Sequence, residues 1–77
     1  MNSLDWKEIT KLKKIVRASD QRLCGNIIAE YNDNIVVIQG NNINFGEYLI
    51  PKSKVDHYDG NEIYLNIPYD KISDFDF

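Results

Sequence analysis

The sequence predicts an all-β protein: a small, strongly bent antiparallel β-barrel of five to six strands with a short N-terminal helix. Two observations support this prediction. Short β-rich runs alternate with clusters of Asn, Asp and Gly along the middle of the chain. A chain of 77 residues is also long enough for only one domain. We therefore expect a single domain over 1–77, with a helix over about 5–12, the barrel over about 13–67 and a C-terminal tail over 68–77.

The N-terminal helix is predicted from a capping pair and a helical repeat. Asp5 is followed three residues later by Glu8, which is the spacing of a capping box. Trp6, Ile9 and Leu12 then recur at intervals of three, which places them on one helical face. These residues predict a helix of about two turns.

Five segments have the composition of β-strands, and they cover residues 15–18, 23–31, 35–39, 47–50 and 62–67. The last of them alternates most cleanly, with Ile63, Leu65 and Ile67 on one face. Residues 35–38 are apolar on both faces. This predicts a strand that is central in the sheet or covered on its outer side.

Turn-forming residues separate the predicted strands, at 19–22, 32–34, 40–46 and 59–60. Gly25 interrupts the second strand and suits a tight bend. Pro51 and Pro68 each end a strand, because proline cannot donate a backbone hydrogen bond. Residues 52–58 are expected to form a short turn or one helical turn.

The apolar residues divide into an interior set and an outer set. If each strand alternates regularly, the interior holds Ile27, Ala29, Val37, Ile50, Ile63, Leu65 and Ile67. The alternation then leaves Ile28, Val36, Ile38 and Tyr64 on outer faces. Apolar patches on a surface commonly mark interfaces. Together with Trp6, Phe75 and Phe77, these residues are the candidate partner-binding set. The chain itself, a second copy in a homodimer or a different protein could cover them.

The tail combines aromatic rings with carboxylates. Phe75 and Phe77 alternate with Asp74 and Asp76, so an extended tail would turn both rings to one side. We expect this strip to dock, either on its own barrel beside Trp6 or on a neighbouring molecule.

Charge is distributed unevenly along the chain. Residues 1–22 hold six Lys or Arg and three Asp or Glu, whereas residues 23–77 hold three and nine, for a net charge of −3. An acidic chain is a poor general ligand for nucleic acid. The residues that could contact phosphate are Lys7, Lys11, Lys14, Arg17 and Arg22. A solvated helix face is the preferred interpretation of these residues.

Few residues are suited to chemistry. Cys24 and His57 are the only cysteine and histidine, and we interpret them as a core residue and a solvated turn residue, not as a nucleophile and its base. Asp56, Asp59 and Glu62 do not have the spacing of an EF-hand loop. We therefore predict no catalytic residue, no metal and no cofactor, and so no enzyme.

The apolar runs are short. The longest covers residues 35–38, far below the roughly 20 residues of a membrane-spanning helix. The N-terminal residues also lack the basic leader and apolar stretch of a secretory signal. These features predict a cytoplasmic protein without membrane insertion.

Four segments of the chain resemble the PRC-barrel family, and they cover residues 19–28, 35–37, 48–55 and 58–65. The family pattern has a turn and a Gly-containing strand, then an Ile-Pro-Lys-Ser segment and a Tyr-Asp-Gly turn before the closing strand. These last elements correspond here to residues 50–53 and 58–60, and the resemblance covers roughly residues 12–67. One departure is Asp20-Gln21, where the family usually has Asp-Gly.

The resemblance implies a function of the binding type, because this family is defined by a barrel and not by a reaction. It includes the cytoplasmic domain of the photosynthetic reaction-centre H subunit, the C-terminal domain of the ribosome maturation factor RimM, and stand-alone archaeal proteins, some of them connected with cell division. The archaeal group is the most similar. We expect a protein-interaction adaptor or assembly module linked to archaeal cell division. The alternative is an RNA- or ribosome-associated assembly module resembling the RimM domain.

Overall fold

Asp5 caps the N-terminal helix, as its spacing to Glu8 predicted. In the computed structural model, the Asp5 Oδ1 atom accepts a hydrogen bond of 3.2 Å from the Glu8 backbone N–H. The helix α1 spans Trp6–Lys11 and Leu12 is its C-cap. It buries Ile9 against the core. The structure describes residues 4–40 and 45–77, and no helix within them is long and apolar enough to cross a membrane.

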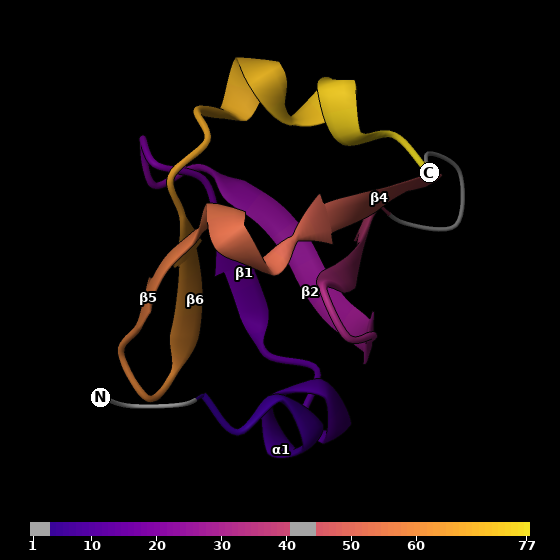
Figure 1. Ribbon diagram of the computed structural model, residues 1–77. Helices are drawn as coiled ribbons and strands as arrows, with labels where there is room; N and C mark the ends of the chain where they lie inside the picture. Colours follow the sequence, from indigo (N-terminus) through magenta and orange to yellow (C-terminus); the bar gives the residue numbers. More distant parts are fainter. Residues whose placement is uncertain (1–3, 41–44) are drawn as a thin grey trace.

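Six strands form one curled sheet, in the order β4-β3-β2-β1-β6-β5 (Figure 1). Their bounds are β1 Ile15–Arg17, β2 Leu23–Glu30, β3 Asn34–Gly40, β4 Phe45–Pro51, β5 Val55–Tyr58 and β6 Glu62–Leu65. The sheet curls into half a barrel, which confirms the prediction of a small, strongly bent β-fold with a short N-terminal helix. Residues 41–44 of the expected loop lie outside the described residues.

One strand pair departs from the expected antiparallel pattern. β1 pairs with β2 antiparallel but with β6 parallel, so that Val16 lies beside both Gly25 and Ile63. A parallel pair needs a long crossover between its two strands. Strands β2 to β5 supply that crossover here, and β1 joins the β2–β3–β4 meander to the β5–β6 hairpin.

The segment 52–58 contains a strand that the sequence did not predict. Lys52–Lys54 forms a single turn of 3-10 helix (η1), as expected, but Val55–Tyr58 forms β5. The expectation of a turn throughout is therefore wrong in its second half. β5 exists because it pairs with β6 at the edge of the sheet, with His57 opposite Tyr64.

The core lies on the concave side of the sheet. Twelve residues form its buried cluster, and these are Ile9, Val16, Ala18, Cys24, Ile27, Ile35, Val37, Ile50, Ile63, Leu65, Ile67 and Ile72. Six of the seven expected interior residues are among them. Ala29 is the exception, because a β-bulge shifts the register of β2 between Ile27 and Ala29. The extra residue places Ala29 opposite Val36, on the other face from Ile27.

The tail forms a 3-10 helix and not an extended strip. This helix, η2, spans Tyr69–Phe75. Tyr69, Ile72 and Phe75 are spaced by three residues, and a 3-10 helix with three residues per turn aligns them on one side. Ile72 belongs to the core cluster, and Tyr69 and Phe75 pack against it.

After η2 the chain pairs with the edge of β4. Asp76 forms a bridge with Tyr48, and the Phe77 backbone N–H donates a hydrogen bond of 2.9 Å to the Glu47 carbonyl oxygen. The tail therefore lies on its own sheet. It does not lie beside Trp6, because η2 and α1 occupy opposite ends of the half-barrel (Figure 1).

Candidate functional site

Apolar side chains cover part of the face opposite the core. Ile35 and Val37 of β3 point into the core, so Val36 and Ile38 between and beyond them point to the other side. Val36 lies opposite Ala29 of β2 and opposite Leu49 of β4. A row of three apolar residues therefore crosses three strands. We define the outer apolar face as Ile28, Ala29, Val36, Ile38 and Leu49.

The helices α1 and η2 each contribute a buried residue to the core, which lies on the side of the sheet opposite this face. The helix α1 places Ile9 in the core cluster, and η2 places Ile72 there. Both elements thus pack on the concave side of the sheet, at opposite ends of the half-barrel. Ile28, Ala29, Ile38 and Leu49 are half-buried. None of the five side chains of the outer apolar face belongs to the core cluster.

Val36 differs from the other members of the candidate set. Its exposure is 2%, although it does not belong to the core cluster. It lies in the central row between Ala29 and Leu49, whose side chains flank it. Val36 therefore lies on the outer face but offers almost no accessible surface to a partner. Val36 instead supports the neighbours that form the accessible part of the face.

The remaining candidate residues lie elsewhere. Trp6 packs on the core at the α1 end, where the Lys52 Nζ atom lies 5.2 Å from its ring centroid. Phe75 packs on the core at the other end, and Phe77 is 66% exposed beside β4. Tyr64 lies on β6. Val36 and Ile38 therefore share one face of β3 and Ile28 lies at the bulge of β2, whereas the other four candidates lie elsewhere.

The five basic candidates do not form one surface. Lys7 and Lys11 belong to α1, whereas the Arg22 guanidinium lies 5.8 Å from the ring centroid of Tyr69 in η2, at the opposite end of the fold (Figure 1). Arg17 Nε donates a hydrogen bond of 2.6 Å to Glu62 Oε1. This partner raises the pKa of Arg17.

Arg17 and Arg22 make further polar contacts within the chain. Arg17 also donates to the Gln21 carbonyl oxygen at 3.1 Å, and Arg22 Nε lies 3.7 Å from Asp20 Oδ2. Lys14, the fifth candidate, precedes β1 and is half-buried. Both arginines therefore already face carboxylates of their own chain.

Cys24 and His57 lie in different environments. Cys24 is fully buried in the core, where burial raises the pKa of its thiol to about 11. His57 is exposed on β5, and its described contacts are with Asp56 and Tyr64. A catalytic pair needs a thiolate beside its base. The described contacts do not provide this arrangement.

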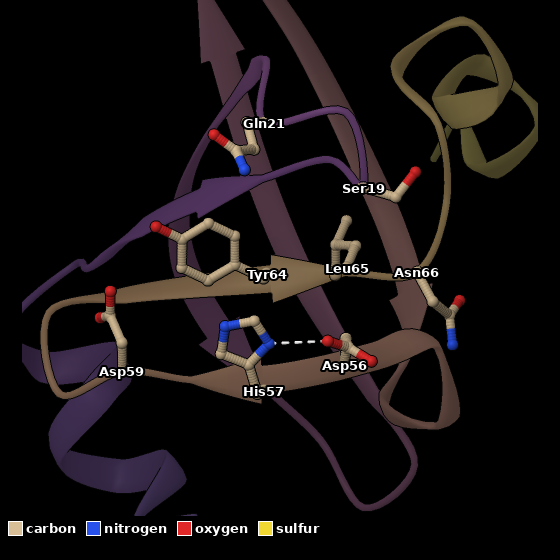
Figure 2. A pocket seen from close by; sticks show the side chains of 8 residues that line it. All are labelled: Ser19, Gln21, Asp56, His57, Asp59, Tyr64, Leu65 and Asn66. Carbon is tan, nitrogen blue, oxygen red and sulfur yellow. Dashed lines mark hydrogen bonds and ion pairs between the residues drawn. The ribbon is translucent and has the colours of Figure 1, made fainter.

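An open pocket of about 480 Å³ lies beside β5 and β6 (Figure 2). Its lining residues are Ser19, Gln21, Asp56, His57, Asp59, Tyr64, Leu65 and Asn66. The His57 and Tyr64 rings stack with centroids 4.6 Å apart and planes inclined by 8°. The His57 Nδ1 atom lies 2.7 Å from Asp56 Oδ2. We name this site the β5–β6 pocket.

The acidic turn next to this pocket is held by the backbone. Asp59 Oδ1 accepts hydrogen bonds from the Asn61 and Glu62 backbone N–H groups, at 2.8 and 2.7 Å. These bonds lower the pKa of Asp59. In the part of the chain that the structure describes, no three His, Cys, Asp or Glu side chains come together as a set of metal ligands.

Sequence reasoning missed the β5–β6 pocket because it did not predict β5. The pocket requires His57 to lie opposite Tyr64, and that pairing joins two strands across the Asp59-Gly60 turn. The available signal was the Asp59-Gly60 turn dipeptide directly before a predicted strand, which is typical of a hairpin. Ala29 of the outer apolar face was missed because of the bulge in β2. Leu49 lies inside the predicted strand 47–50, but it was not assigned to the outer set.

No family model, curated protein or solved structure matches the chain. The PRC-barrel resemblance therefore stays a prediction that depends on the four segments quoted above.

Proposed function

We propose that this protein is a non-enzymatic interaction module, an adaptor or assembly factor, that binds a protein partner through the outer apolar face. One observation carries the proposal: the row of Ala29, Val36 and Leu49, extended by Ile38, lies on the face opposite the core. The described helices both pack on the concave side. Ile28, Ala29, Ile38 and Leu49 thus remain partly exposed on a face outside the core.

The energetics favour a reversible complex with another protein. Fully burying an exposed Ile or Leu side chain contributes about 1.5–3 kcal/mol. Because these side chains are already half-buried, each gains only part of that amount on binding. A stable complex buries about 800 Å² on each partner, more than the four half-buried side chains of this face can offer. The partner must therefore add contacts around the face, which favours a different protein over a permanent homodimer.

The RNA-associated alternative has less support. Phosphate binding needs several unopposed cations on one surface. Here the arginines face Glu62 and Asp20, and the α1 lysines lie at the other end of the fold from Arg22. The net charge of −3 opposes the approach of a polyanion.

A backbone feature supports the PRC-barrel part of the proposal. Gln21, which stands where the family pattern has Gly, adopts a φ of +70°. That value lies in the left-handed region, which glycine adopts most readily. The turn thus keeps the glycine-like conformation without the glycine. Membership of this family would place the proposed adaptor in the cytoplasm and, by analogy with the stand-alone archaeal members, in cell division.

Comparative capture from a lysate of the source organism tests the proposal. The baits are the wild-type protein, Ile38→Thr and Leu23→Thr, each analysed by quantitative mass spectrometry before and after nuclease treatment. Threonine suits a strand at both positions. Leu23 is the matched control because it lies on β2 outside the outer apolar face and is 52% exposed. A partner of the outer apolar face should be retained by wild type and Leu23→Thr and lost by Ile38→Thr.

Two outcomes would contradict the proposal. If Leu23→Thr loses the same proteins as Ile38→Thr, retention reflects general apolar adhesion. If nuclease treatment removes the retained proteins from the wild-type bait, RNA connects them to the bait. The RNA-associated alternative then replaces the proposal.

A further inference from the structure

The β5–β6 pocket offers a second binding site, on strands separate from the outer apolar face. Figure 2 shows the His57 and Tyr64 rings side by side, with Asp56 on one side of His57 and Asp59 on the other. Ser19 and Gln21, in the turn before β2, also line the pocket. The pocket thus combines a flat aromatic surface with carboxylate and amide oxygens.

The charge of the pocket favours a cation. Its lining includes two Asp side chains and no Lys or Arg. The nearby Arg17 guanidinium is held by Glu62 and the Gln21 carbonyl, so it does not neutralise Asp56 or Asp59. The Asp56 carboxylate is 61% exposed and has only His57 as its described partner. A positively charged group entering the pocket would therefore meet exposed acceptors.

The shape of the pocket favours a planar cation. The His57 ring stacks on Tyr64 by one face, and its side chain remains 55% exposed. A planar group can extend this stack on the free face of the imidazole. Guanidinium is planar, stacks on aromatic rings and donates several hydrogen bonds within one plane. The Asp56 carboxylate lies beside that ring to accept them.

We propose that the β5–β6 pocket binds the guanidinium group of an arginine side chain presented by a partner protein. The guanidinium stacks on His57 and donates hydrogen bonds to the Asp56 carboxylate. This inference goes beyond the proposed function and does not rest on the outer apolar face.

Competing ligands fit the site less well. A lysine ammonium would be attracted by the same carboxylates, but it is a compact charge and does not stack as a plane. A phosphate or other anion would be repelled by Asp56 and Asp59. A neutral planar side chain would stack but would lose the charged hydrogen bonds. Arginine alone uses both the rings and the carboxylates.

Titration with short peptides, followed by NMR of the full chain, tests this inference. The probes are the terminally blocked tripeptide Gly-Arg-Gly, the same peptide with Lys, and the same peptide with citrulline, the uncharged isostere of arginine. We expect the arginine peptide to shift the His57 and Tyr64 ring resonances saturably, with a dissociation constant of about a millimolar. The citrulline peptide should bind at least about tenfold more weakly and the lysine peptide several-fold more weakly.

Substitutions separate a specific site from general attraction to an acidic protein. Asp56→Asn keeps the side-chain shape and should weaken the arginine peptide about tenfold. Asp70→Asn is the matched control, because Asp70 is exposed on η2 outside the pocket, and it should leave binding unchanged. Ile38→Thr should also leave it unchanged, so failure of the proposed function and failure of this inference remain distinguishable.

Three results would overturn the inference. The first is equal binding of the arginine and citrulline peptides. The second is an equal loss in Asp56→Asn and Asp70→Asn. The third is the absence of saturable shifts at His57 and Tyr64.

Discussion

Gly25 of β2 lies against the backbone of Ile38 in β3: a Cβ atom at Gly25 would be 2.1 Å from the Ile38 carbonyl oxygen. The φ of Gly25 is +140°, a conformation that other residues rarely adopt. Both features occur where β2 bends between β1 and β3. The curl of the sheet at this point therefore depends on the missing side chain.

Gly25→Ala should lower the free energy of unfolding by about 2–4 kcal/mol, from steric overlap and backbone strain together. Gly60→Ala is the control. Gly60 also has a positive φ, of +92°, but its added Cβ would meet nothing within 4 Å. It should lose only about 1 kcal/mol from strain. Urea denaturation measures both, and equal losses would show that close packing on Ile38 is unimportant.

Thiol chemistry tests the position of Cys24. Its pKa is raised from 9.0 to about 11 by burial, so the folded protein contains roughly a hundredfold less thiolate at about pH 8 than the unfolded chain. Reaction with an aromatic disulfide reagent should be slower in the native protein by at least that factor. The same reaction in urea supplies the reference rate. A native rate equal to the unfolded rate would contradict a buried, unreactive thiol.

Asp59 should contribute to acid sensitivity. Its pKa in the folded protein is held below the ordinary 3.8 by the backbone N–H groups of Glu62 and Asn61. The associated stability is therefore present above about pH 4 and is lost as the pH falls through the folded value. The urea midpoint of Asp59→Asn should fall less between about pH 5 and 2.5 than that of wild type. Parallel pH profiles for the two proteins would contradict this assignment.

The tail should stabilise its own sheet. Deleting residues 75–77 removes the half-buried Phe75 ring, the Asp76–Tyr48 bridge and the Phe77–Glu47 hydrogen bond. We expect a loss of about 2 kcal/mol that does not depend on protein concentration. Phe77→Ala should change stability by less than about 0.5 kcal/mol, since the ring is mostly exposed. A melting temperature that rises with protein concentration would instead place the tail on a second copy.

Much of the fold was predictable from local pattern. The Asp5–Glu8 spacing located the helix, and local composition and alternation located β1, β2, β3, β4 and β6. The parallel pairing of β1 with β6 was not predictable, because a strand's composition carries no information on its direction. β5 was missed because Asp56 and His57 make its sequence polar, and only its pairing with β6 makes it a strand.

The tail shows a different kind of error. Two spacings were present in the same segment: the alternation of Phe75 with Phe77, and the three-residue interval of Tyr69, Ile72 and Phe75. The second determines the structure, because it places all three side chains on the core as a 3-10 helix. The outer apolar face was predicted only in part. Ile28, Val36 and Ile38 follow from alternation, whereas Ala29 joins them only through the bulge.

The affinity of a reconstituted complex tests the central claim most directly. A partner identified by capture is purified, and its dissociation constant is measured by calorimetry with wild type, Ile38→Thr and Leu23→Thr, at low and moderate salt. We expect Ile38→Thr to weaken binding at least about tenfold, with Leu23→Thr unchanged and little dependence on salt. An unchanged affinity for Ile38→Thr, or binding that disappears with added salt, would contradict a docking site on the outer apolar face.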